Sequence, residues 1–247
     1  MTIHPLSEGT FTIGFDKVFH PFDASVDVLE ERSRGSLLVE VQPFLVVTEK
    51  DRIILDTGLG FAGKSGRPQI HEALEKLGYS PGDITKVLLS HLHKDHAGGL
   101  MHADQHGALT LTFPYADYYI YRAEAAAMSE AGYPSYHADE ITPLFQGGQA
   151  VWLDGERGDI DGYIRWWHTG GHSPQHIVFL IEEGGEKIFF GGDEAPQAKQ
   201  MKVKYIAKYD FDGKRAMELR EGWVEQGKRE AWRVLFYHDV GTPTVQL

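Results

Sequence analysis

The chain has 247 residues and a formal net charge of −12, from 24 basic and 36 acidic side chains. The negative surface would repel phosphates, which disfavours nucleic acid as a partner. The absence of cysteine excludes disulfide bonds and thiol catalysis. No stretch approaches the roughly eighteen apolar residues of a membrane span, and no basic start with an apolar signal core is present. We therefore expect a cytoplasmic protein that acts on a small molecule, without a membrane partner.

The first part of the chain combines short apolar runs with one helical pattern. The apolar runs predict strands, the first three connected as hairpins, at 37–41, 44–47, 52–55 and 86–89. Pro68 and apolar residues at i, i+3, i+4 and i+7 predict a helix over 69–77. The sequence shows no obvious linker, and layered α/β enzymes commonly reach this length as one unit, so we expect one domain over 1–247.

The least regular segment, 113–150, is rich in Tyr, Pro, Gly and Ala. It predicts a helix over 122–129 and a loop or short-helix insertion around Tyr133-Pro134-Ser135-Tyr136 and 143–145. Its rings either form an apolar wall over a substrate or only cover the edge of the core, and both interpretations stay open.

The second part of the chain repeats the order of strands followed by a helix. The helix is expected over 210–226, and strands are expected at 163–167, 177–181, 187–190 and 233–237. Strand-rich halves with helices outside predict an α/β fold of four layers, an αββα sandwich.

The most informative motif is Ser90-His91-Leu92-His93-Lys94-Asp95-His96, which directly follows the apolar run 87–89. In extended backbone, residues two apart point to the same side. His91 and His93 can therefore bind one cation while Asp95 and His96 turn toward a second.

Three further candidate ligands stand where a predicted strand gives way to a loop. They are His172, Asp193 and His238. Strand ends are where open α/β sheets collect functional groups. Because the chain has no cysteine, the site is limited to nitrogen and oxygen ligands, which suit zinc and also tolerate iron or manganese.

The ordered set His-x-His-x-Asp-His, His, Asp, His resembles the metallo-β-lactamase superfamily of dinuclear metallohydrolases. The resemblance runs from about Phe44 to His238 and includes the turn Asp56-Thr57-Gly58. One departure is Gln175, where many members have glycine. The resemblance implies an αββα sandwich that holds two divalent metal ions.

Carried over residue by residue, the resemblance implies two ligand sets and a bridging carboxylate. His91, His93 and His172 would hold the first ion, Asp95, His96 and His238 the second, and Asp193 would bridge them. A metal-bridging hydroxide would attack an acyl carbonyl.

Two carboxylates have further expected roles. Asp95 would orient the attacking hydroxide or relay a proton to the leaving group. Asp56 would either accept the free N–H of a metal-binding histidine or only stabilise its own turn. By contrast, His176 follows the Gly-Gly-His-Ser-Pro turn and is expected to pack in the core or to support a ligand, while His172 binds the metal.

The layout is most similar to the lactonase-type branch, which predicts a lactone or ester as the substrate. That branch has a tyrosine three residues after the bridging aspartate, where this chain has Pro196. A hydroxyacyl-glutathione thioester is the alternative substrate. A mononuclear iron dioxygenase and a non-catalytic metal-binding protein are the alternatives from other classes, and the oligomeric state stays open.

Overall fold

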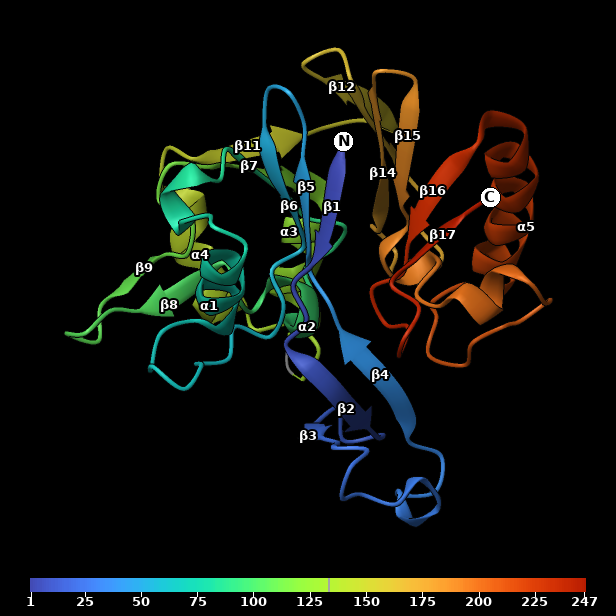
Figure 1. The fold of residues 1–247 in the computed structure, drawn as a ribbon, viewed down its shortest axis with the longest axis horizontal. Coiled ribbons are helices and arrows are strands. Elements are labelled where there is room, and N and C mark those ends of the chain that lie inside the picture. Colours follow the sequence, from blue (N-terminus) through green and yellow to red (C-terminus); the bar gives the residue numbers. More distant parts are fainter. Residues whose placement is uncertain (133) are drawn as a thin grey trace.

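The computed structural model describes residues 1–132 and 134–247, and every statement below refers to those residues. Two six-stranded sheets pack face to face between outer helices (Figure 1). The first has the order β1 (Thr2–Pro5), β5 (Phe44–Val47), β6 (Arg52–Leu55), β7 (Lys86–Leu88), β10 (Asp117–Tyr121), β11 (Ala150–Leu153). The second has the order β12 (Arg157–Ile160), β13 (Ile164–His168), β14 (Ile177–Glu183), β15 (Glu186–Phe190), β16 (Trp232–Leu235), β17 (Thr244–Gln246).

The main core lies between the two sheets, and strand periodicity determines which side chains enter it. In β5, Phe44 and Val46 join this core while Leu45 packs toward the helices on the outer face, as the period of two requires. The ring of Phe44 meets that of Phe190 from the second sheet, with the ring centroids 6.2 Å apart. Apolar burial in this core therefore holds the two sheets together.

The outer faces of both sheets are covered by amphipathic helices. α1 (Gln69–Lys76), α3 (Arg122–Ala131) and α4 (Ala138–Gln146) bury their apolar side chains on the first sheet. α5 (Gly213–Glu230) covers the second sheet, with Trp223 packed at 4.8 Å from the Phe189 ring. The predicted four-layer αββα sandwich is confirmed.

Several predicted elements differ in detail from the observed ones. β4 (Leu37–Val41) forms no hairpin with β5 but joins a three-stranded sheet with β2 (Gly9–Ile13) and β3 (Phe19–Pro21). Pro43 separates β4 from β5, because proline has no N–H and interrupts a continuous ladder. The final helix begins at Gly213 rather than at 210, since the Asp212 carboxylate caps it by accepting from the Arg215 N–H at 3.0 Å.

The middle segment is more regular than the sequence indicates, because β10, α3 and α4 lie within it and β11 begins at its end. α4 continues through Pro143, which confirms a short helix there. Tyr133, part of the expected insertion, lies outside the described residues. The shorter elements are α2 (Lys94–Ala97), β8 (Met101–Ala103), β9 (Leu109–Leu111), η1 (Leu29–Glu31), η2 (Pro81–Asp83), η3 (Gly192–Glu194) and η4 (Ala198–Met201).

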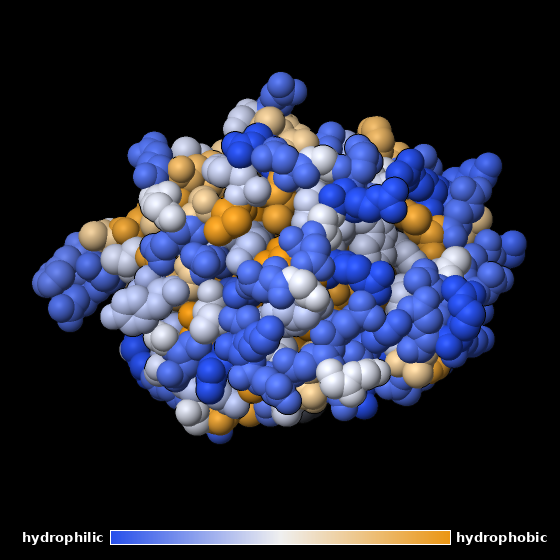
Figure 2. Space-filling model, turned by 90° about the horizontal axis from the view of Figure 1, so that it is seen from above, coloured by the Kyte–Doolittle hydropathy of each residue, from blue (hydrophilic) through white to orange (hydrophobic). Residues whose placement is uncertain are grey.

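The face that contains the β5–β6 and β14–β15 turns is mainly hydrophilic, with apolar residues in small separate groups (Figure 2). Across 1–132 and 134–247, no helix has the length and apolar character needed to cross a membrane. The strands that matter for function end at the opposite edge. β6 runs parallel to β7, and β15 runs parallel to β16, so the loops after these strands emerge at one edge of the sandwich.

Candidate metal centre

Loops that follow β7, β13, β15 and β16 meet at this edge and bring all the predicted ligands together. Every one of them is buried or half-buried: His91, His93, Asp95, His96, His172, Asp193 and His238. The loop after β7 comes from the first sheet, whereas the other three loops come from the second. The site therefore exists only where the two sheets meet.

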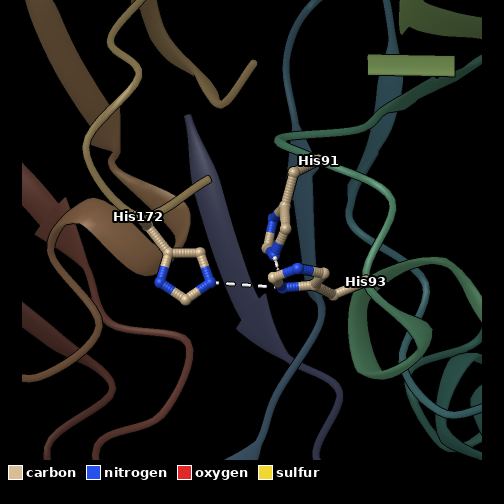
Figure 3. A group of neighbouring side chains, drawn as sticks. All are labelled: His91, His93 and His172. Carbon is tan, nitrogen blue, oxygen red and sulfur yellow. Dashed lines mark hydrogen bonds between the residues drawn. The ribbon is translucent and has the colours of Figure 1, made fainter. Parts of the chain in front are cut away.

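The first cluster consists of His91, His93 and His172, whose rings point toward one another (Figure 3). His93 Nδ1 lies 2.9 Å from His91 Nε2 and 3.2 Å from His172 Nε2. Burial and the charge of His172 lower the pKa of His93 to about 3, and burial lowers the pKa of His91 well below its usual range. Burial would lower the pKa of His172, but Asp193 and Asp210 outweigh burial and raise that pKa. Imidazole nitrogens that converge in this way are the donor set that a borderline cation such as zinc prefers, because they bind it in their neutral form.

The second cluster consists of Asp95, His96 and His238. The Asp95 Oδ2 atom lies 3.4 Å from His238 Nε2 and 3.7 Å from His96 Nε2. Burial would raise the pKa of Asp95, but His96 and His238 lower it to about 2. Burial would likewise lower the pKa of His238, yet Asp193 and Asp95 raise it to about 10. The carboxylates around the second cluster thus favour a positive charge there, and a bound cation would supply one.

Asp193 lies between the two clusters. Its Oδ2 is 3.2 Å from His172 Nε2, while its Oδ1 is 3.1 Å from His238 Nε2 and 3.2 Å from His96 Nε2. Although it is buried, Oδ1 makes no hydrogen bond of acceptable geometry with any described residue. A buried carboxylate oxygen without a hydrogen-bond partner is costly. The residues present therefore fit divalent cations, with Asp193 positioned to contact both.

Asp56 lies directly behind the second cluster, at a backbone φ of +53°. Its Oδ2 accepts from the Ser90 hydroxyl at 2.7 Å and lies 2.7 Å from His96 Nδ1, and its Oδ1 accepts from the Ser90 N–H at 2.7 Å. Burial raises the pKa of Asp56 despite these contacts. Since its lone pairs are occupied by protein donors, the carboxylate is placed to fix the His96 ring, with Nε2 facing the site.

Two other contacts fix imidazoles in the same way and were missed by sequence reasoning. His172 Nδ1 lies 3.0 Å from Asp210 Oδ1, and His238 Nδ1 lies 2.6 Å from the backbone oxygen of Glu40. Asp210 comes just before α5 and carries no local signal of this role. The Glu40 contact uses main-chain oxygen, so no side-chain pattern can reveal it.

Glu194 organises the loop that carries His172. Its Oε1 accepts from the N–H groups of Gly171 at 2.7 Å and His172 at 3.0 Å, and from the Thr169 hydroxyl at 2.8 Å. Its neighbour in the site, His176, is fully buried, with its Nε2 3.2 Å from the Asp193 N–H. His176 belongs to none of the groups that converge on a possible cation, which agrees with the packing role expected for it.

Comparisons with known proteins agree with this geometry. Residues 39–238 match the family model of the metallo-beta-lactamase superfamily. An atrochrysone carboxyl ACP thioesterase of Passalora fulva is 31% identical over 153 residues, which cover 61% of this chain and 36% of that protein. An N-acyl homoserine lactonase of Bacillus cereus is 27% identical over 226 residues, which cover 83% of this chain and 84% of the lactonase. The chain spans little more than a third of the length of the first curated relatives it matches.

Solved structures share the fold. A probable metal-dependent hydrolase from Staphylococcus aureus has a TM-score of 0.80 at 22% identity, covering 99% of this chain and 91% of that one. AidC, a dizinc quorum-quenching lactonase solved with a product, has a TM-score of 0.68 at 20% identity, covering 99% of this chain and 93% of that one. The family match, the fold and the converging side chains agree: the chain belongs to the metallo-β-lactamase superfamily.

Proposed function

We propose that the protein hydrolyses an acyl carbonyl compound, a lactone or ester, with two divalent cations held at the metal centre. His91, His93 and His172 would hold one ion, and the second cluster, Asp95, His96 and His238, would hold the other. The observation that carries the proposal is the Asp193 carboxylate, which contacts both clusters and has one buried oxygen without a hydrogen-bond partner. Zinc, or alternatively iron or manganese, would supply an activated water and positive charge for the carbonyl oxygen.

The chain's own residues orient the reaction. Asp56, Asp210 and the Glu40 carbonyl hold the outer nitrogens of three imidazoles, so the inner nitrogens stay directed into the site. Asp95 would orient the attacking water or relay a proton to the leaving group. Its backbone oxygen accepts from the Tyr237 hydroxyl at 2.7 Å, which fixes the start of the short helix that carries it.

A lactone is supported by the relative named as an N-acyl homoserine lactonase, which is matched over most of both chains. Pro196 stands where the lactonase-type branch has a tyrosine, and its carbonyl accepts from the His238 N–H at 2.9 Å. Two other tyrosines lie against the first cluster. The Tyr136 hydroxyl already donates to Glu124 at 3.1 Å, whereas the Tyr209 ring lies 6.0 Å from that of His172. Tyr209 is therefore the better candidate to meet a substrate oxygen.

An acyl thioester is the second candidate, supported by relatives named as ACP thioesterases and by one specific observation. Four lysines lie between residues 199 and 208, in a segment that borders His172. Such a segment suits a substrate with an anionic leaving group. A mononuclear iron dioxygenase would need only one ion, so the second cluster of Asp95, His96 and His238 would bind no metal.

The test is a substrate panel combined with elemental analysis. The purified protein is reconstituted with zinc, manganese or iron separately, and its metal content is measured. It is then assayed with acyl-homoserine lactones, aryl esters, acyl thioesters, a β-lactam and a phosphodiester. We expect two ions per chain and turnover of acyl substrates. One ion per chain would contradict the dinuclear centre, and phosphodiester cleavage without acyl activity would contradict the substrate class.

A further inference from the structure

The segment 199–211, here named the lysine segment, differs from the rest of the surface. It contains four lysines and one acidic residue, a net charge of +3 in a chain whose net charge is −12. The lysines Lys199, Lys202, Lys204 and Lys208 are all exposed. Between and beside them lie exposed apolar side chains, Val203 (52%), Tyr205 (39%), Ile206 (54%) and Phe211 (70%). Positive charge and apolar surface therefore coincide on one short stretch of chain.

The lysine segment contacts the metal centre through its last two residues. It leads from η4 into α5, the red helix of Figure 1. Its Asp210 contacts the His172 ring, and the Phe211 N–H donates to the His172 carbonyl at 3.0 Å. Ala207 is buried, and Arg220 of α5 donates to the Tyr205 carbonyl, so the backbone is held from beneath. A molecule bound to this segment would lie beside the site.

Most of this positive charge is not neutralised by the protein. Lys204 pairs with Glu221 at 3.0 Å. Lys199, Lys202 and Lys208 form no ion pair with any residue in 1–132 or 134–247. An acidic partner would be repelled by the rest of this acidic chain and attracted here, so the charge distribution orients such a partner toward the metal centre.

We propose that the lysine segment is the docking surface for an acidic carrier protein that presents an acyl thioester to the metal centre. The proposal rests on the thioester activity proposed above. Water would add to the acyl carbon as the C–S bond breaks, giving a carboxylic acid and a thiol that takes a proton from the water. The interleaved apolar side chains favour a protein over a small anion, because protein interfaces combine an apolar centre with charged surroundings.

Binding is tested without catalysis, using a bacterial fatty-acid acyl carrier protein with a fluorophore on its phosphopantetheine thiol. Fluorescence anisotropy gives the Kd for the wild type and two charge-matched triple variants. Lys199→Glu, Lys202→Glu and Lys208→Glu reverse the lysine segment. Lys50→Glu, Lys76→Glu and Lys228→Glu reverse exposed lysines elsewhere, and both variants change the net charge from −12 to −18. We expect the first to weaken binding about 10-fold or more relative to the second, and added salt to weaken wild-type binding.

Equal Kd values for the two variants, or no binding by the wild type, would overturn the docking surface. A second arm compares kcat/KM for acyl-carrier protein, acyl-coenzyme A and an uncharged acyl-N-acetylcysteamine thioester. A selective loss for the carrier substrate in the lysine-segment variant supports the proposal. An equal loss for coenzyme A would instead indicate a small-anion subsite, and stronger binding to anionic lipid vesicles would indicate a membrane. If the carrier binds but no thioester is hydrolysed, the proposed thioester activity fails while the docking surface stands.

Discussion

Two clusters of charged side chains lie at opposite ends of strand β7, and they differ in how their charges are satisfied. At its start, Lys86 Nζ lies 3.0 Å from Asp51 and 2.9 Å from Asp161. Asp51 also accepts from the Thr85 hydroxyl at 2.7 Å and from the Tyr163 hydroxyl. Beyond the other end of β7, imidazole nitrogens face one another and Asp193 Oδ1 has no hydrogen-bond partner.

The difference shows how burial of charge relates to function. The Lys86 cluster has donors matched to its acceptors, so it needs nothing else and serves to join the two halves of the chain. At the metal centre, Asp193 Oδ1 is buried without a hydrogen bond of acceptable geometry, although His96 Nε2 and His238 Nε2 lie 3.2 and 3.1 Å away, so a cation would complete its surroundings. The two clusters therefore differ in how completely the protein satisfies their carboxylates, and not only in how much charge they bury.

The largest effect is expected from Asp193→Ala. Because this carboxylate contacts both clusters, its loss should remove bound metal and reduce kcat/KM by more than the roughly 100-fold typical of supporting residues. Elemental analysis and steady-state kinetics measure the two effects. The matched change at the other cluster is Asp51→Ala, which also removes a buried carboxylate. It should leave two ions in place; if it also empties the site, the two clusters are not independent.

The second largest effect is expected from removal of the bound metal, which should lower the free energy of unfolding. A ligand present at about 1,000 times its Kd stabilises a folded protein by about 4 kcal/mol. We therefore expect chelation to lower the free energy of unfolding by roughly that amount, measured by urea unfolding with and without zinc. In the Lys86→Met variant, chelation should lower the free energy of unfolding by the same amount. A smaller loss in that variant would mean that the clusters at the two ends of β7 are coupled.

Lys86→Met should itself cost about 3 kcal/mol of stability, since it leaves the buried Asp51 carboxylate without its cation. Urea unfolding of the zinc-loaded variant measures this loss. Metal content and kcat/KM at a temperature well below the unfolding midpoint should stay near wild type. A loss of metal here would contradict a purely structural role for the cluster.

Asp56→Asn should have the smallest of these effects. The amide can no longer hold the His96 N–H and both Ser90 donors, so metal affinity or activity should fall about 10- to 100-fold. A competition titration against a chromophoric chelator measures the affinity. Wild-type affinity and activity in this variant would assign Asp56 to the turn alone, which is the other interpretation its sequence context allows.

The sequence predicts well those elements of the fold and the site that depend on residues close together in the chain. The strands β5 and β6, the helix α1 and the position of the histidine motif after β7 follow from local patterns. Contacts between distant segments were not predictable. Asp210 contacts His172 across 38 residues, and Glu40 contacts His238 across 198, because the fold alone brings these segments together. The four lysines are visible in the sequence, whereas their place beside His172 is not.

The division of the candidate ligands between two sheets has a mechanical consequence. His91, Asp95 and His96 are carried by the first sheet and His172, Asp193 and His238 by the second, so the spacing of the sheets sets the separation of the donor atoms. That spacing depends on side chains such as Phe44 and Phe190, which meet in the core. Trimming one of these rings would shift coordination geometry, visible in the absorption spectrum of a cobalt-substituted protein, without altering any ligand. Reactivity can thus be tuned by mutation of the interior.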